Sequence, residues 1–154
     1  MTKPDTAERW FFCRAGHIHW GALGAAGLLL RHLPQRGQPV YLLVERSRWV
    51  DEGGTWGIPG GAMHHGESPE EAAHRAAASQ IWPVPAYRVT GTAAQDCGGG
   101  WKFHIVCADV EAPFTAYTAR DTEATGWFTV PEMSGLRLYS GVRRWVGEHP
   151  QPGA

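Results

Sequence analysis

The sequence predicts a single α/β domain whose mixed β-sheet is covered by helices on both faces. Three observations support this class: a length of 154 residues, apolar segments separated by glycine- and proline-rich turns, and one well-marked central helix. We therefore expect one domain over residues 1–154. The first few residues and residues 149–154 are expected to fray.

The first half of the chain predicts two buried strands. Residues 20–30 are mostly glycine, alanine and leucine, and residues 39–45 (PVYLLVE) form a second apolar segment. Pro34 and Gly37 lie between them and are typical of a turn. Residues 48–67 contain six glycines, so we expect a loop with unusual backbone angles there.

The second half predicts the helices and the remaining strands. Ser68, Pro69 and Glu71 form a capping box with proline at the first helical position, which predicts a helix from Pro69 to about Ile81. Residues 87–94, 101–110 and 125–130 have the composition of strands. A short amphipathic helix is expected over residues 140–148.

Composition narrows the class of function. A net charge of −1 and a pI near 6.7 argue against nucleic acid as a partner and favour a small molecule. No segment is apolar for long enough to predict a membrane span or a signal peptide, so we expect a cytoplasmic protein. Cys13, Cys97 and Cys107 are odd in number and lack CxxC or zinc-ligand spacing, which predicts reduced thiols.

Residues 60–82 (GGAMHHGESPEEAAHRAAASQIW) carry the most specific pattern in the chain. Gly61, Glu67 and Arg75 match the first glycine, first glutamate and arginine of the Nudix box, and the preceding WGIPGG matches the phosphate-facing loop. The chain therefore resembles the Nudix (MutT-like) hydrolases over roughly residues 17–146. The resemblance implies a Nudix-like α/β/α sandwich and an ancestral hydrolase of nucleoside diphosphates linked to another moiety.

The metal-binding part of the Nudix box is degenerate in this sequence. Its three helical glutamates would fall at Ala76, Ser79 and Gln80, where the spacing places all three on one helical face. Converging carboxylates bind Mg²⁺, whereas a methyl, a hydroxyl and an amide supply no charge. With the box lost, we expect no cofactor, and a structural role for the remaining pair of Glu67 and Arg75. Further metal-ligand candidates are Asp121 and Glu123.

Other residues are candidates for a rewired site. His64 and His65 in the glycine-rich loop and His104 on a strand are candidate proton carriers, because imidazole titrates near neutral pH. Each has the alternative of being solvent-exposed or structural. The predicted substrate-binding residues are Trp56, Gly60, Gly61, Trp101 and Lys102, with core or loop anchoring as the alternative for the tryptophans.

We expect a Nudix-fold small-molecule protein whose ordinary Mg²⁺-dependent hydrolysis is lost or strongly reduced and which acts as a metal-independent enzyme through the cleft histidines. Two alternatives stay open. The first alternative is a weak Mg²⁺-dependent Nudix hydrolase that retains activity through Asp121, Glu123 and Gln80. The second is a non-catalytic module for a nucleotide or other metabolite. All three imply a small-molecule ligand, with a phosphorylated one favoured by the loop, and leave monomer and homodimer open.

Overall fold

The computed structural model describes residues 5–149 and is built on one mixed sheet. Its main strand order is β11-β4-β3-β9-β8. Strands β3 and β9 are parallel, while the other neighbours along this order are antiparallel. These strands are β3 (Ala25–His32), β4 (Val40–Arg46), β8 (Arg88–Asp96), β9 (Lys102–Asp109) and β11 (Thr122–Phe128).

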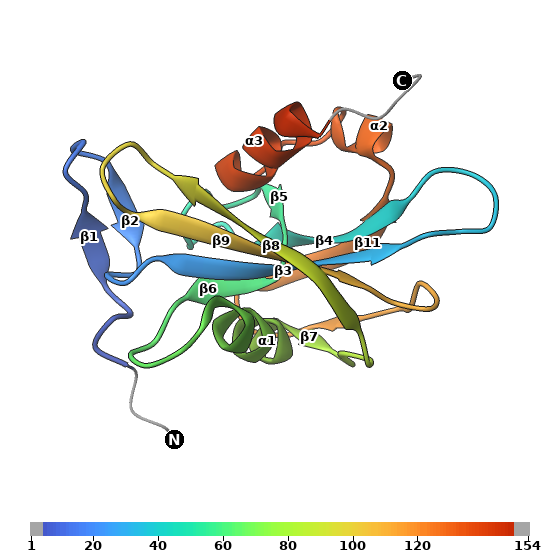
Figure 1. Cartoon of the computed structure of the whole chain (residues 1–154), viewed down its shortest axis with the longest axis horizontal. Helices are drawn as coiled ribbons and strands as arrows, with labels where there is room; N and C mark the ends of the chain where they lie inside the picture. Colours follow the sequence, from blue (N-terminus) through green and yellow to red (C-terminus); the bar gives the residue numbers. More distant parts are fainter. Residues whose placement is uncertain (1–4, 150–154) are drawn as a thin grey trace.

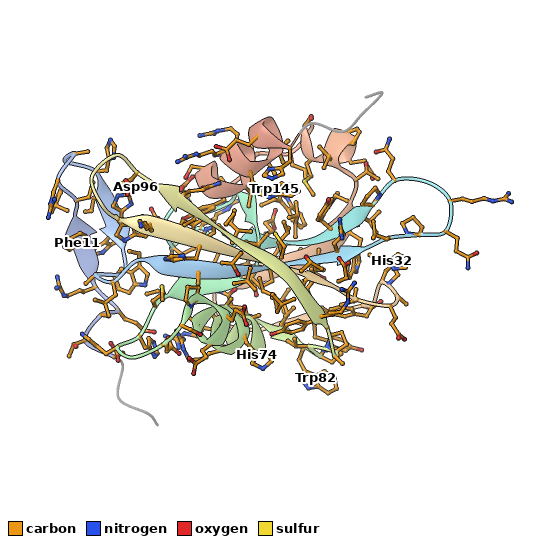
Figure 2. All side chains as sticks on the ribbon, viewed as in Figure 1. Phe11, His32, His74, Trp82, Asp96 and Trp145 are labelled. Atoms are coloured by element: carbon orange, nitrogen blue, oxygen red, sulfur yellow. The ribbon has the colours of Figure 1, made fainter. Side chains whose placement is uncertain are left out.

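Helices cover both faces of the sheet. Helix α1 (Pro69–Gln80) lies on one side, and α2 (Val130–Met133) and α3 (Ser140–Glu148) lie on the other (Figure 1). Because side chains of a strand alternate, Leu28 of β3 packs with the α1 layer and Leu29 packs with the α3 layer. Trp145 of α3 is buried against the sheet (Figure 2). The predicted α/β/α sandwich is confirmed.

Helix α1 begins where the sequence predicts. Ser68 is the N-cap, its hydroxyl accepts a hydrogen bond from Glu71 N–H, and the Glu71 carboxylate accepts one from Ser68 N–H. The helix ends at Gln80, one residue earlier than expected, because Ile81 is already extended. Helix α3 spans the predicted residues, Ser140–Glu148.

Several short elements were not predicted from the sequence. An N-terminal hairpin, β1 (Trp10–Phe12) with β2 (Ile18–Trp20), precedes the main sheet. Strand β3 then begins only at Ala25, because Gly21 and Gly24 have φ values of +112° and +99° and interrupt the apolar segment. Helix α2 has its own capping box and begins at Val130, the last residue of the predicted strand 125–130.

The central strands β3 and β4 diverge along their length. They pair directly only at Arg31–Tyr41 and His32–Val40. Towards the other end, β3 pairs with β6 (Gly60–Ala62), whereas β4 pairs with β5 (Trp56–Gly57). Gly60 permits this insertion, because a Cβ there would lie 2.6 Å from the Ala26 carbonyl oxygen. The glycine-rich loop is thus built into the sheet and opens a gap between its central strands.

The remaining strands and the ends of the chain complete the fold. The short strands β7 (Ile81–Trp82) and β10 (Tyr117–Thr118) pair beside α1. None of the helices within residues 5–149 is long and apolar enough to cross a membrane. The expected fraying falls largely on residues 1–4 and 150–154, which lie outside the residues described.

Candidate functional site

A pocket of about 330 Å³ opens between the diverging ends of β3 and β4. This volume is typical of a small-molecule site. Residues from the N-terminal hairpin, the central strands, the glycine-rich loop and the end of α1 all contribute to its wall. The lining residues are Glu8, Trp10, Trp20, Ala25, Val44, Arg46, Trp49, Val50, Asp51, Ile58, Gly60, Gly61, Ala62, Gln80, Phe103, Arg120, Asp121, Thr122 and Tyr139.

Three tryptophans form an aromatic wall at this pocket. Trp10 and Trp20 face each other across the β1–β2 hairpin, with ring centroids 5.2 Å apart in an edge-to-face arrangement. Trp49, which follows β4, lines the same pocket and is 75% exposed. Large aromatic side chains that remain exposed at a cavity are suited to stacking on a planar ligand. Trp10 and Trp20 were not predicted from the sequence, because the hairpin that carries them has no turn dipeptide of the usual kind.

A partly buried cluster of Arg46, Asp51 and Tyr139 forms part of the pocket wall. The Arg46 guanidinium donates to the Asp51 carbonyl oxygen through Nε and Nη2, at 2.9 and 2.6 Å, and lies 4.7 Å from the Tyr139 ring centroid. Burial, with Glu52 nearby, raises the pKa of the Asp51 carboxyl. Burial also raises the pKa of Tyr139 to about 12. Asp51 is therefore the pocket carboxyl best suited to hold a proton.

Asp121 and Glu123, the further metal-ligand candidates, lie in different surroundings. Asp121 lines the pocket, has a φ of +63°, and accepts a hydrogen bond from Trp49 Nε1 at 3.3 Å. Arg120 lies 3.7 Å from its other oxygen. Glu123 is outside the pocket wall and accepts a hydrogen bond from Ser47 Oγ at 2.8 Å. Only Asp121 is therefore placed to meet a ligand.

The side chains at the positions of the metal ligands of a Nudix box contact other groups of the protein. Gln80 accepts from Gly60 N–H at 2.9 Å and donates to the Gly60 carbonyl at 2.8 Å, so its amide is held by the loop backbone. Ser79 Oγ donates to the Ala76 carbonyl at 2.7 Å. Ala76 is buried against Gly61. These three side chains do not fit Mg²⁺, which prefers carboxylate ligands.

Glu67 and Arg75 join the loop to the helix, as the resemblance implies. Arg75 donates to both carboxylate oxygens of Glu67, at 2.6 and 3.0 Å, and to the Ala62 carbonyl at 2.8 Å. Glu67 also accepts from His64 N–H at 2.7 Å. The hydrogen bond from Arg75 holds the pKa of Glu67 below its usual value, against the opposing effect of burial. The pair is a structural clasp beside the pocket.

The predicted catalytic histidines are not gathered at one place. His64 Nε2 lies 2.9 Å from Glu8, whose side chain lines the pocket. His65 is more exposed and lies 2.9 Å from Asp5. His104 is not part of the pocket wall; burial and the charge of Lys102 lower its pKa. None of the three histidines lines the pocket, and His64 contacts a lining residue, Glu8. The catalytic roles proposed for these histidines stay predictions.

The predicted substrate-binding residues also divide. Gly60 and Gly61 lie in the pocket wall. Trp56 instead packs edge-to-face on Phe128 in the α3-side core, with centroids 5.3 Å apart. Trp101 is buried away from the pocket wall, and Lys102 is exposed outside it. The pocket therefore gives no support to a ligand-binding role for these last three residues.

Known proteins with similar sequences identify the family of this chain. A model of the NUDIX domain matches residues 22–146. The putative 8-oxo-dGTP diphosphatase 3 of Mycobacterium tuberculosis is 34% identical over 140 residues, which cover 87% of this chain and 64% of that protein. This chain thus spans slightly less than two thirds of the length of that relative.

Solved structures of Nudix proteins resemble this structure. The crystal structure of a Nudix hydrolase from M. smegmatis, RenU, is 32% identical, with a TM-score of 0.78 and coverage of 96% of this chain and 99% of that one. The NUDIX domain of Shewanella oneidensis NrtR, complexed with ADP ribose, shares the fold at 21% identity and a TM-score of 0.59, over 82% of this chain and 84% of its own. The domain match and the sandwich with its loop-built pocket lead to one conclusion: the chain belongs to the Nudix family.

Proposed function

We propose that this protein binds a nucleotide-type small molecule in the β3–β4 pocket and that its Mg²⁺-dependent diphosphate cleavage is lost or strongly reduced. The observation that carries the proposal is the absence of a carboxylate at positions 76, 79 and 80 of α1, where the side chains contact the protein backbone or pack against it. Ala76 and Ser79 offer no charge, and the Gln80 amide is held by the Gly60 backbone. Without anionic ligands on this face, nothing there would hold the ion that neutralises a diphosphate in this class of reaction.

The pocket wall supports a nucleotide-type ligand. Trp10, Trp20 and Trp49 offer surfaces for a planar base, and the Arg120 guanidinium, which also lines the pocket, offers a charge partner for phosphate. The names of two relatives indicate which probes to use. The M. tuberculosis relative is named for 8-oxo-dGTP, and the Shewanella domain was crystallised with ADP ribose.

The first experiment separates binding from cleavage. Tryptophan fluorescence and calorimetry with 8-oxo-dGTP, dGTP and ADP ribose are run with Mg²⁺ and with EDTA, and phosphate or pyrophosphate release is followed in parallel. We expect saturable binding that persists in EDTA and is weakened at least tenfold by Trp10→Ala. Rapid Mg²⁺-dependent cleavage by the natural sequence would refute the loss of activity. Absence of binding to every probe would refute the nucleotide assignment.

A gain-of-function variant tests the role of the helix directly. Ala76→Glu/Ser79→Glu/Gln80→Glu restores three carboxylates at the box positions, whereas Ala78→Glu adds a charge at an exposed position of the same helix. If the pocket is that of a former hydrolase, Mg²⁺-dependent cleavage appears in the triple variant and not in the control. Equal activity in the natural chain and both variants would show that this helical face does not limit the reaction.

A second candidate function is metal-independent acid–base chemistry in the same pocket. Its support is that Asp51 lines the pocket and has a raised pKa, and that Glu8, another lining residue, lies 2.9 Å from His64 Nε2. An acid with a pKa nearer neutrality is suited to proton transfer. Once a turnover reaction is found, Asp51→Asn should abolish it and His64→Ala should alter its pH profile. Unchanged rates in both variants would exclude this chemistry.

A further inference from the structure

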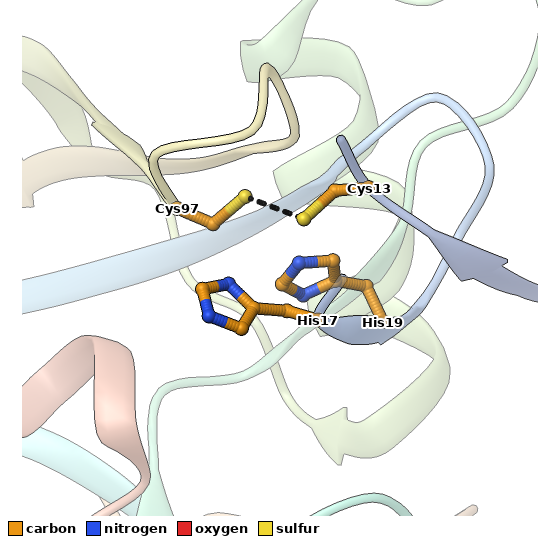
Figure 3. Close-up of side chains that lie close together, drawn as sticks. All are labelled: Cys13, His17, His19 and Cys97. Atoms are coloured by element: carbon orange, nitrogen blue, oxygen red, sulfur yellow. Dashed lines mark hydrogen bonds between the residues drawn. The ribbon is translucent and has the colours of Figure 1, made fainter. Parts of the chain in front are cut away.

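Two cysteines and two histidines that are distant in sequence meet at one end of the molecule. Cys13 follows β1, and Cys97 lies in the turn between β8 and β9. His17 immediately precedes β2, and His19 is in its middle. One ligand atom from each of the four side chains lies within 4.8 Å of all the others. Figure 3 shows both thiols and both imidazole rings facing the same small space.

The backbone brings the two loops together firmly. Arg14 N–H donates to the Gly99 carbonyl at 3.2 Å and joins the two loops, and within the hairpin Cys13 N–H donates to the His17 carbonyl at 3.0 Å. A Cβ on Gly99 would lie 2.5 Å from Ala15 N and 2.7 Å from Cys13 Sγ, so only glycine permits this approach. The four side chains are therefore placed by a packed interface between two turns.

His19 is held in place with a polar atom unsatisfied. Its ring stacks on Trp101, with centroids 4.0 Å apart and planes 3° from parallel, and Trp101 Nε1 is anchored on the Gly21 carbonyl at 2.7 Å. The Nε2 atom of His19 is buried and has no hydrogen-bond partner among the residues described. Buried polar atoms are nearly always paired, so this nitrogen indicates a ligand that completes the site.

The distances and the ligand types fit zinc better than a disulfide or a hard cation. The two Sγ atoms are 3.3 Å apart, far beyond a disulfide bond of about 2.05 Å. In a tetrahedral site with Zn–S bonds of about 2.3 Å, the sulfurs stand roughly 3.8 Å apart, which requires only a small adjustment. Two thiolates with two imidazoles are a common set for structural Zn²⁺.

We infer that Cys13, His17, His19 and Cys97 bind one structural Zn²⁺ that fastens the β1–β2 hairpin to the β8–β9 turn. The hairpin carries Trp10 and Trp20, so the ion holds part of the pocket wall in place without lying in the pocket. The inference does not depend on the proposed function, because the ion's role is to fix the hairpin. It departs from the expectation, drawn from cysteine spacing alone, that the chain has no zinc site.

The metal content of the untagged full-length protein tests the inference. After expression with added zinc and extensive dialysis, elemental analysis should find about one Zn²⁺ per chain. Cys13→Ser and Cys97→Ser should each lose most of it, while Cys107→Ser, which changes the third cysteine outside the cluster, should retain it. Zinc content below a tenth of an ion per natural chain, or full retention in both cluster variants, would overturn the assignment.

Cobalt spectroscopy keeps the test decisive if a cysteine variant fails to fold. Metal-free natural protein titrated with Co²⁺ should develop the thiolate charge-transfer band and the intense visible bands of a tetrahedral site. His17→Ala, a change at an exposed side chain, should bind Co²⁺ about tenfold or more weakly. Zinc should also slow hydrogen exchange in residues 10–20. Absence of the cobalt bands, or peptide mapping that finds Cys13 and Cys97 disulfide-linked in freshly purified protein, would refute the zinc site.

Discussion

The Glu67–Arg75 clasp offers the sharpest test of the energetics of this fold. Glu67→Gln keeps the size of the side chain but removes the charge that accepts from Arg75 Nε and Nη2 and from His64 N–H. The Glu67 side chain is only 17% exposed and Arg75 is 34% exposed, so the lost interactions are partly shielded from water. The loss should therefore exceed that of a surface ion pair.

The magnitude follows from the hydrogen bonds involved. A hydrogen bond to a charged group contributes about 1.5–3 kcal/mol, and the three bonds of Glu67 share one carboxylate and are not additive. The amide oxygen of the substituted glutamine would still accept one of them, so we expect a loss of roughly 2–3 kcal/mol. At about 2–4 °C per kcal/mol for a chain of this size, Tm should fall by roughly 4–12 °C.

The control is an ion pair with a similar distance and greater exposure. Arg144 and Glu148 are 3.0 Å apart on α3, with exposures of 48% and 52%. Glu148→Gln should change stability by less than about 0.5 kcal/mol. Urea and thermal denaturation at pH 7 compare the two variants with the natural protein. Equal losses in both variants, or a loss below about 0.5 kcal/mol in Glu67→Gln, would refute the argument from burial.

The stability difference between the natural protein and Glu67→Gln should also depend on pH. Because the folded-state pKa of Glu67 lies below its usual value near 4.5, the carboxylate contributes its full stabilisation above that value. The contribution is lost as the pH falls through the folded-state pKa. The stability difference between the natural protein and Glu67→Gln should thus be constant from about pH 6 upward and shrink below about pH 4.

Three further changes have expected outcomes. Ser68→Ala removes the N-cap of α1 and should cost about 1 kcal/mol in urea denaturation. Asp51→Asn should stabilise the protein at pH 7, because the raised pKa makes the charged form unfavourable; this gain should vanish below about pH 4, and a variant less stable at pH 7 would contradict it. Gly60→Ala should cost about 2 kcal/mol or more, since its Cβ would meet the Ala26 carbonyl, whereas Gly91→Ala meets nothing within 4 Å and serves as control.

Short motifs in the sequence were sufficient to predict helices α1 and α3. The Ser68 capping box and Pro69 fixed the start of α1, and the apolar spacing in residues 140–148 fixed α3. Helix α2 has the same kind of signal, because Thr129 and Glu132 form a capping box with Pro131 between them. It was not predicted because residues 125–130, which end at the first residue of α2, have the composition of a strand.

The candidate site was harder to predict because it depends on tertiary contacts. The spacing from Gly61 to Arg75 identified the loop and its clasp, since both lie in one segment. Trp10 and Asp51 line the same pocket although they are 41 residues apart, and no periodic pattern in the sequence predicts that they do. Cys13 and Cys97 are likewise 84 residues apart and meet through Gly99.

The N-terminal hairpin lies outside the segment that defines the family. The NUDIX domain match begins at residue 22, yet Glu8, Trp10 and Trp20 all contribute to the pocket wall. Two members could therefore share the whole matched domain and still present different surfaces to a ligand. An alignment restricted to the matched domain would leave these residues out. Two proteins that agree within that alignment can therefore bind different ligands where a hairpin of this kind lines the pocket.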